Sequence, residues 1–188
     1  PTRSENEPAS ARAVFVDIDR TLCDSRQRIP DSALEALAQV RERGHRLFAC
    51  TGRSAPEVYP RFWEVGFEGL VGGAGGYASV GNRVLVDERM PREHVDALTA
   101  LWEELDAFYI WQGPDQMGPS DGYLDFFVPR AGQHPEDWIE YAQSITPFIV
   151  DIDGGAFTKV TAYVPPEKAS MERVSAALPD GYRAIIGS

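Results

Sequence analysis

Residues 13–22 read AVFVDIDRTL, and they place two aspartates directly after a short apolar run. A run of this kind is typical of a strand that is buried on both faces of a parallel sheet. Asp17 and Asp19 then lie outside the carboxyl end of that strand, where open α/β sheets bind their ligands. Two neighbouring carboxylates are costly unless a cation or a proton joins them. The stretch therefore predicts a Mg²⁺ site with an aspartate nucleophile.

The residues that follow continue as strand, helix and strand. Apolar side chains recur at helical spacing up to residue 43, the predicted helix ends at Gly44, and HRLFAC at 45–50 reads as a second strand. This strand runs directly into Thr51, Gly52 and Arg53. Parallel strands joined by a right-handed crossover end at the same edge of a sheet. We therefore expect Thr51 to lie beside Asp17.

Later segments predict the rest of this core and a second domain. Residues 54–65 predict a helix that Pro60 interrupts or shortens, 70–71 a brief strand, and 77–80 with 83–87 a hairpin. From residue 91 we expect helices at 91–105, 135–145 and 165–178, with strands at 108–111, 123–128, 157–164 and 182–186. This mixture is typical of an α+β unit whose helices cover an antiparallel sheet. We divide the chain into a flexible tail at 1–12, a core at 13–88 and a second domain at 89–188.

The composition narrows the class of protein. At 188 residues the chain is long enough for one sizeable domain or two small ones. Its net charge of −11 argues against nucleic acid or an anionic membrane as the main partner, because both require a basic surface. No run of eighteen apolar residues occurs, and Cys23 and Cys50 are too few for a disulfide framework. We expect a soluble, cytoplasmic protein.

Two motifs carry a resemblance to a known family. VFVDIDRTL followed by LFACTGR resembles motifs I and II of the haloacid dehalogenase (HAD) superfamily. The TGR triplet, the glycine-rich GGAGGY turn and the hairpin after it are similar to the Cof-type sugar-phosphate phosphatases. Those enzymes insert an α/β cap domain after the second motif. The resemblance implies an α/β fold: a Rossmann-like core, whose parallel sheet is incomplete in this chain, with an α+β cap from residue 89.

The resemblance also implies a role for each motif residue. Asp17 is the nucleophile that forms an aspartyl-phosphate, and its second oxygen binds Mg²⁺. Asp19 protonates the leaving alcohol and then activates water, while its backbone carbonyl binds the metal. Thr51 hydrogen-bonds a phosphate oxygen, and Gly52 allows the backbone N–H to approach it. Arg53 is the nearest obvious cation and is expected to contact substrate or cap.

Two departures from the family pattern bear on these roles. Arg20 stands where the family usually has glycine, so its long cationic side chain either reaches the mouth of the substrate site or points to solvent. The family's third motif, a lysine, and its fourth, an acidic GDxxND-like run, are absent. Lys159 lies in FTKVTAYVP, which reads as a cap strand, so we do not assign it as the catalytic lysine.

These observations lead to one main hypothesis and several alternatives. We expect a Mg²⁺-dependent phosphatase that hydrolyses small phosphorylated metabolites, above all sugar phosphates, through an aspartyl-phosphate. The same two aspartates serve phosphomutases, so a phosphomannomutase-like enzyme is one alternative. A shortened, inactive HAD-fold binding module is another. Because only about three core strands are predicted, an exposed apolar edge and face would require either a further segment or a homo-oligomer to cover it.

Overall fold

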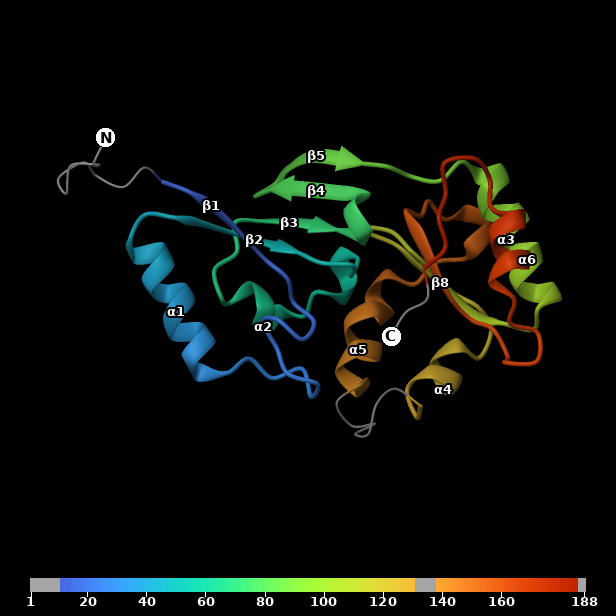
Figure 1. The fold of residues 1–188 in the computed structure, drawn as a ribbon, viewed down its shortest axis with the longest axis horizontal. Helices are drawn as coiled ribbons and strands as arrows, with labels where there is room; N and C mark the ends of the chain where they lie inside the picture. The colour runs from blue at the N-terminus through green and yellow to red at the C-terminus, as the bar shows by residue number, and fades with distance from the viewer. Residues whose placement is uncertain (1–10, 131–137, 186–188) are drawn as a thin grey trace.

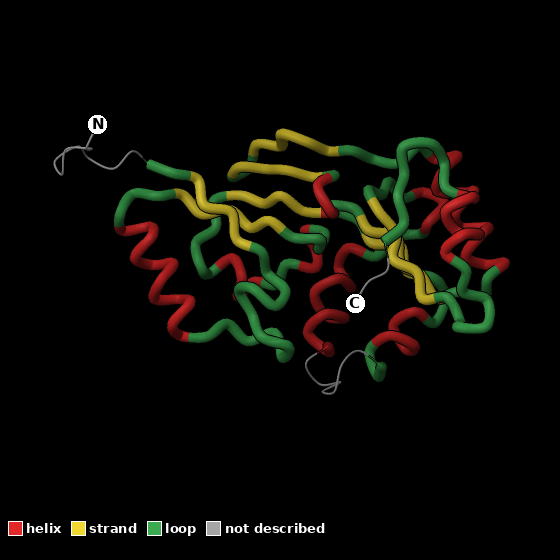
Figure 2. The backbone as a smooth tube through the Cα atoms, in the orientation of Figure 1, coloured by secondary structure: helices red, strands yellow, loops and turns green. Residues whose placement is uncertain are grey.

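The chain folds into two sheets, and its structure is a computed structural model that describes residues 11–130 and 138–185. The first sheet has the order β1-β2-β3-β4-β5 and the second the order β7-β6-β8. The two sheets lie next to each other along the long axis of the molecule, as the ribbon in Figure 1 and the strands in Figure 2 show. The predicted α/β fold with an added α+β unit is confirmed.

Parallel pairing brings the two predicted motif strands together in the first sheet. β1 (Ala13–Val16) pairs in parallel with β2 (Arg46–Cys50), and β2 pairs in parallel with β3 (Gly69–Gly72). Helix α1 (Asp31–Glu42) makes the connection from β1 to β2. The antiparallel hairpin of β4 (Tyr77–Val80) and β5 (Arg83–Asp87) extends the sheet beyond β3, after the short 3₁₀ turn η2 (Gly73–Gly75).

The two faces of the first sheet are covered unequally. On one face, Val14 of β1 packs with Leu37 of α1 around a core that includes the fully buried Leu47. Alternate residues of a strand point to opposite faces. Phe15 therefore points the other way, where it stacks on Phe48 at a ring-centroid distance of 5.2 Å and stays 58% exposed. On this second face Phe15 is thus exposed, whereas Phe48 beneath it is buried.

The helix predicted at 54–65 is interrupted at Pro60, as expected. It consists of a 3₁₀ turn, η1 (Ala55–Glu57), and a short helix, α2 (Pro60–Trp63). Tyr59 between them is extended, with φ −61° and ψ 153°. Pro60 has no N–H to continue a helix, and its ring disfavours the helical conformation of the residue before it.

The second sheet is antiparallel, with β6 (Phe108–Gln112) between β7 (Met117–Pro119) and β8 (Lys159–Tyr163). Helix α3 (Arg92–Glu104) and helix α6 (Met171–Ala177) pack on one face, where Trp111 lies in their apolar core. The other face carries Ile110, which belongs to the core of the first sheet together with residues of α4 (Tyr123–Phe127) and α5 (Ile139–Ile145). This face is turned toward the ends of β1 and β2.

Several predictions for the second half differ from the structure. Residues 123–128 were expected as a strand but form α4, because Tyr123, Phe126 and Phe127 follow helical spacing and all three rings contact Tyr163. The strand that follows β6 is instead β7, which lies between the two expected strands.

The ends of the chain show further differences from the expectations. Helix α6 begins at residue 171, later than expected, and Ser170 caps it by accepting a hydrogen bond from the N–H of Arg173. Residues 182–185 form no strand, and residue 186 lies outside the described residues, as do residues 135–137 of the predicted helix and 1–10 of the predicted tail. Two further 3₁₀ turns, η4 (Thr146–Phe148) and η5 (Ile152–Gly154), connect α5 to β8. No helix in the described residues is long and apolar enough to cross a membrane.

Candidate active site

The loop after β1 presents both aspartates at the edge of the first sheet. Tight backbone bonds from the N–H groups of Leu22 and Cys23 to the carbonyl of Ile18, each 3.0 Å, close the loop. Both aspartates are exposed. The hydroxyl of Thr21 donates to Oδ2 of Asp17 at 2.9 Å, so Thr21 fixes the orientation of that carboxylate.

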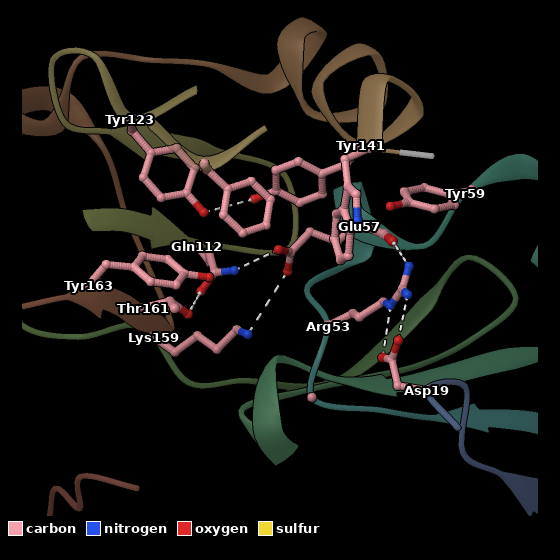
Figure 3. A pocket seen from close by; sticks show the side chains of 13 residues that line it. Asp19, Arg53, Glu57, Tyr59, Gln112, Tyr123, Tyr141, Lys159, Thr161 and Tyr163 are labelled. Carbon is pink, nitrogen blue, oxygen red and sulfur yellow. Dashed lines mark hydrogen bonds and ion pairs between the residues drawn. The ribbon is translucent and has the colours of Figure 1, made fainter. Parts of the chain in front are cut away.

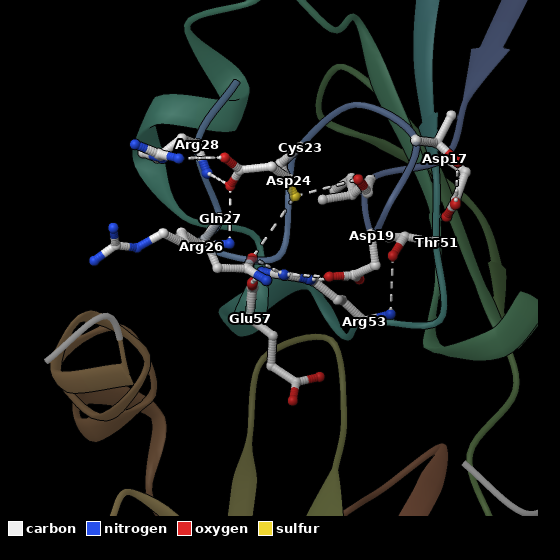
Figure 4. Close-up of polar contacts among 12 residues, drawn as sticks. Asp17, Asp19, Cys23, Asp24, Arg26, Gln27, Arg28, Thr51, Arg53 and Glu57 are labelled. Atoms are coloured by element: carbon white, nitrogen blue, oxygen red, sulfur yellow. Dashed lines mark hydrogen bonds and ion pairs between the residues drawn. The ribbon is translucent and has the colours of Figure 1, made fainter. Parts of the chain in front are cut away.

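The segment after β2 lies at the same edge. The register pairs Val16 with Ala49, so the chain leaves β1 and β2 at matching positions. Thr51 is buried, and its hydroxyl accepts a hydrogen bond from the N–H of Arg53 at 3.2 Å. Figure 4 shows Thr51 next to the loop that carries Asp17, as expected from parallel pairing.

Arg53 binds Asp19 with two parallel hydrogen bonds. Its Nε donates to Oδ2 at 3.0 Å and its Nη2 to Oδ1 at 2.6 Å. The guanidinium also lies over the rings of Tyr59 and Phe62, at 5.0 and 5.2 Å from their centroids, and only 11% of the Arg53 side chain is exposed. A bidentate, stacked arginine is a rigid partner for a carboxylate. In this structure Arg53 therefore holds the side chain predicted to be the acid and base.

Arg53 also sets the protonation state of Asp19. Burial by itself raises the pKa of Asp19, but the hydrogen bonds and charge of Arg53 outweigh it, so that this pKa is lowered. Gln27 and, more weakly, Lys159 contribute to the lowering. Asp19 is thus a carboxylate at neutral pH.

A loop that follows the aspartates supports this pair. Oδ1 of Asp24 accepts hydrogen bonds from the N–H groups of Arg26 and Arg28, at 2.8 and 3.0 Å. The turn buries Gln27, which has a positive φ of 61° and accepts a hydrogen bond from the Arg53 guanidinium. Gln27 is not among the predicted site residues. An Asp such as Asp24 is nevertheless a known sequence signal for a turn, because its side chain accepts the backbone N–H two residues later.

A pocket of about 280 Å³ opens beside Arg53, between the two sheets. From the first sheet's side it is lined by Asp19, Gly52, Arg53, Glu57 and Tyr59 (Figure 3). From the second sheet's side it is lined by three polar side chains and five aromatic ones: Gln112, Lys159, Thr161, Tyr123, Phe127, Trp138, Tyr141 and Tyr163. The pocket therefore joins the predicted acid and base to the predicted cap.

Glu57 connects the two halves at the centre of this pocket. Its Oε2 accepts the N–H of Ser54 at 2.7 Å and the Ser54 hydroxyl at 2.9 Å, which forms a capping box at η1. From the second sheet, Gln112 donates to Oε1 at 2.7 Å and Nζ of Lys159 lies 3.9 Å from Oε2. Thr161 in turn donates to Gln112 at 2.9 Å. Glu57 is not among the predicted site residues. The S-x-x-E spacing of residues 54–57 signals only the start of a helix.

The structure sorts the predicted site residues into three groups. Asp19, Gly52 and Arg53 line the pocket. Asp17 and Thr51 lie at the same strand ends but are not among its lining residues. Arg20 is exposed, has a positive φ of 60° and does not line the pocket either.

Some of the oxygen atoms at this edge of the first sheet are suited to bind a hard cation such as Mg²⁺. Mg²⁺ prefers oxygen ligands, and it commonly binds one or two carboxylates together with waters and substrate phosphate. Both side-chain oxygens of Asp19 hold Arg53, whereas Asp17 has only Oδ2 engaged by Thr21. Across residues 11–130 and 138–185, no three His, Cys, Asp or Glu side chains converge on a metal-sized site. Asp17 fits Mg²⁺ through its side chain, and Asp19 only through its backbone carbonyl.

Comparisons with known proteins extend these observations. The "Putative phosphatase YkrA" of Bacillus subtilis (strain 168) is 26% identical over 107 residues, which are 57% of this chain and 42% of that protein. A hypothetical protein of Geobacillus kaustophilus HTA426 has a similar fold, with a TM-score of 0.64, 22% identity, and coverage of 88% of this chain and 62% of that one.

The HAD subclass IIB sugar phosphatase BT4131 is also similar in fold, with a TM-score of 0.63 at 20% identity, over 90% of this chain and 64% of that one. The chain therefore spans less than two thirds of the length of each of these relatives. The sequence profile of the haloacid dehalogenase-like hydrolases matches residues 14–167, which confirms the family expected from the two motifs. The chain belongs to the haloacid dehalogenase-like hydrolases.

Proposed function

We propose that this chain forms part of a Mg²⁺-dependent phosphatase that hydrolyses small phosphorylated metabolites, above all sugar phosphates. The observation that carries the proposal is the bidentate Arg53–Asp19 pair, which lies between the exposed carboxylate of Asp17 and a pocket large enough for a small leaving group. The family membership and the phosphatase names of two relatives support it.

In the first step of this proposal, a carboxylate oxygen of Asp17 attacks phosphorus. The phosphorus–oxygen bond to the leaving alcohol breaks, and Asp19 donates a proton to the alcohol oxygen. The contacts of Asp19 with Arg53 favour its carboxylate form, but the negative charge of a bound phosphate raises the pKa of a neighbouring carboxyl group. Thr21 keeps Asp17 pointing at the substrate, and Arg53 keeps Asp19 in place.

In the second step, Asp19 takes a proton from water while the water oxygen attacks the aspartyl-phosphate. Inorganic phosphate leaves, and both aspartates return to their starting states. Thr51 and the backbone N–H after Gly52 are proposed to hold the phosphate oxygens. Asp17 and the backbone carbonyl of Asp19 would hold Mg²⁺, which would supply neutralisation of the phosphate charge.

The test is the replacement Asp17→Asn, which removes the nucleophile and keeps the shape of the side chain. We expect Mg²⁺-dependent phosphate release from p-nitrophenyl phosphate and a panel of hexose phosphates to fall by about three orders of magnitude or more. Asp31→Asn, an exposed acid at the start of α1, is the matched control and keeps the parent rate. Circular dichroism verifies that both variants fold.

Three results would contradict the proposal. An Asp17→Asn variant with the parent rate would exclude the aspartyl-phosphate. An isomerised sugar phosphate without free phosphate would instead favour the phosphomutase alternative. A parent chain that releases no phosphate with Mg²⁺ present would favour the binding-module alternative.

A further inference from the structure

The charged side chains that line the pocket form two opposite pairs. Asp19 binds Arg53, with a shortest distance of 2.6 Å, and Glu57 lies 3.9 Å from Lys159. The other described lining residues are uncharged. The local charge of the lining is therefore zero, although the whole chain carries −11.

The Glu57–Lys159 pair lies where charge is weakly screened. Only 9% of the Glu57 side chain and 24% of the Lys159 side chain are exposed. Glu57 is also fully engaged by Ser54 and Gln112, which fix it in the pocket wall. A ligand with its own negative charge would meet a lysine that is already neutralised and a carboxylate that repels it. An uncharged ligand neither needs attraction from Lys159 nor is repelled by Glu57.

A tyrosine hydroxyl gives the pocket unused hydrogen-bonding capacity. Tyr59 is completely buried, and its hydroxyl has no hydrogen-bond partner among the described residues. Figure 3 shows this hydroxyl pointing into the pocket, toward Tyr141 and Glu57. The hydroxyls of Tyr123 and Tyr141 lie next to it in the pocket wall and contact each other at 3.5 Å. Buried hydroxyls without partners are rare in proteins, so the Tyr59 hydroxyl points to a ligand that carries hydroxyls of its own.

The aromatic wall adds a second requirement on the ligand. Phe127 lies at the centre of this wall, with its ring 5.1 to 5.7 Å from those of Tyr123, Trp138, Tyr141 and Tyr163. The polar wall of Glu57, Gln112 and Lys159 lies beside it, next to Tyr163 (Figure 3). A ring with apolar C–H faces and a rim of hydroxyls matches both walls.

We propose that the Glu57–Lys159 pair makes Glu57 a specificity-determining residue, and that the pocket takes an uncharged, polyhydroxylated leaving group and rejects one with a carboxylate or a second phosphate. This inference rests on the proposed phosphatase function. It adds to that function the charge of the leaving group and the residue that selects it.

Binding without turnover tests the inference. Dissociation constants are measured by calorimetry in an Asp17→Asn background for glucose 6-phosphate and mannose 6-phosphate, against 6-phosphogluconate and fructose 1,6-bisphosphate. Of glucose 6-phosphate and mannose 6-phosphate, we expect the one that binds more tightly to have a dissociation constant at least about tenfold lower than that of either acidic ligand. Free glucose and free gluconate, titrated against the parent chain with Trp fluorescence as readout, are expected to show the same order.

Two variants that remove a charge from the pocket wall test which side chains cause the preference for uncharged ligands. Glu57→Gln keeps the capping box, because Gln serves at that position, and it leaves Lys159 without a countercharge. We expect Glu57→Gln to shift the ratio of the affinity for uncharged ligands to the affinity for acidic ligands by about tenfold or more, in favour of the acidic ligands. Lys159→Met is expected to shift the ratio in the opposite direction. Lys168→Met, which removes the chain's other lysine at Asp106, leaves the ratio unchanged.

The outcomes separate this inference from the proposed function. Acidic ligands that bind as tightly as the uncharged ones, an unchanged ratio in both charge variants, or no binding of any ligand would overturn the inference. Tighter binding of pyridoxal 5′-phosphate than of any sugar phosphate would overturn it in favour of an aromatic leaving group. A parent chain that shows the predicted preference but releases no phosphate would overturn the proposed function alone.

Discussion

Asp24 is the residue on which the loop behind the Asp19–Arg53 pair depends. Its carboxylate accepts two backbone N–H groups and the Arg28 guanidinium, whose Nη2 lies 2.8 Å from Oδ2. The backbone hydrogen bond from Arg28 is the main cause of a lowered pKa for Asp24. Burial opposes it, and the other bonds from Arg26 and Arg28 add to the lowering. The loop in turn holds Gln27 against Arg53.

The lowered pKa predicts how stability depends on pH. An unfolded Asp titrates near pH 3.9, so the contribution of Asp24 is fully present above that pH and is lost as pH falls through the lower folded-state pKa. We expect Asp24→Asn to lower the melting temperature at pH 7, and the difference from the parent to shrink steadily below about pH 4. Thermal unfolding between pH 7 and pH 2.5 measures it. The exposed Asp180→Asn is the control, and a difference that stayed constant with pH would contradict the prediction.

At the scale of elements, strand β3 depends on a residue without a side chain. A Cβ on Gly69 would lie 2.2 Å from the carbonyl oxygen of Ser79 and 3.1 Å from Cδ1 of Phe48. The first of these is a backbone atom of the neighbouring strand β4, which cannot move without breaking the hairpin. Close packing of β3 against β4 therefore requires glycine here.

Substitution of this glycine tests the packing of the sheet. We expect Gly69→Ala to lower the free energy of unfolding by about 1–3 kcal/mol, because overpacking forces the strands apart. Urea unfolding measures the change. Gly154→Ala, where a Cβ meets no atom within 4 Å, is the matched control. Equal stability of the two variants would show that the hairpin adjusts without cost.

The sequence predicted elements best where local signals and tertiary packing agree. The apolar run before Asp17, the helix that ends at Gly44 and the hairpin around Gly81 were all predicted, because turn residues and periodicity mark them. Helix α4 was predicted wrongly as a strand. Its five residues contain three aromatic rings, and such short apolar runs fit either structure until contacts with Tyr163 decide.

At the scale of the whole molecule, Arg89 lies in the segment that joins the two sheets. It forms ion pairs with Asp87 and Asp115 and donates to the carbonyl of Ala156 at 2.7 Å. These partners belong to the end of β5, the turn after β6 and the segment before β8. The Arg89 guanidinium thus links the connecting segment to both sheets.

Removal of this arginine is expected to loosen the connection. In Arg89→Met we expect the N–H of Met90, which donates to the carbonyl of Phe157, to exchange with solvent several-fold faster, while amides in the centres of β2 and β6 keep their rates. Hydrogen–deuterium exchange measures both sets. Arg83→Met on the exposed face of β5 is the control. Unchanged exchange at Met90 would assign the rigidity of the segment to its backbone bonds alone.

The site could be predicted from the sequence only up to the strand ends. Parallel pairing brought Thr51 to the edge that carries Asp17, because register follows from the order of the elements. The Arg53–Asp19 ion pair joins residues 34 positions apart, and Gln112 meets Glu57 across 55 positions. The first contact depends on the loops at one edge of the first sheet and the second on how the two sheets pack, and no local pattern records either.

The position of Lys159 in the pocket has a practical consequence for chemical labelling. The full sequence has only two lysine side chains, one in the pocket wall and Lys168 on the surface. An amine-directed acylating reagent therefore has one target that a bound ligand shields and one that it does not. The ratio of the two labelled peptides in a mass spectrum reports occupancy of the pocket, with the second lysine as its internal standard.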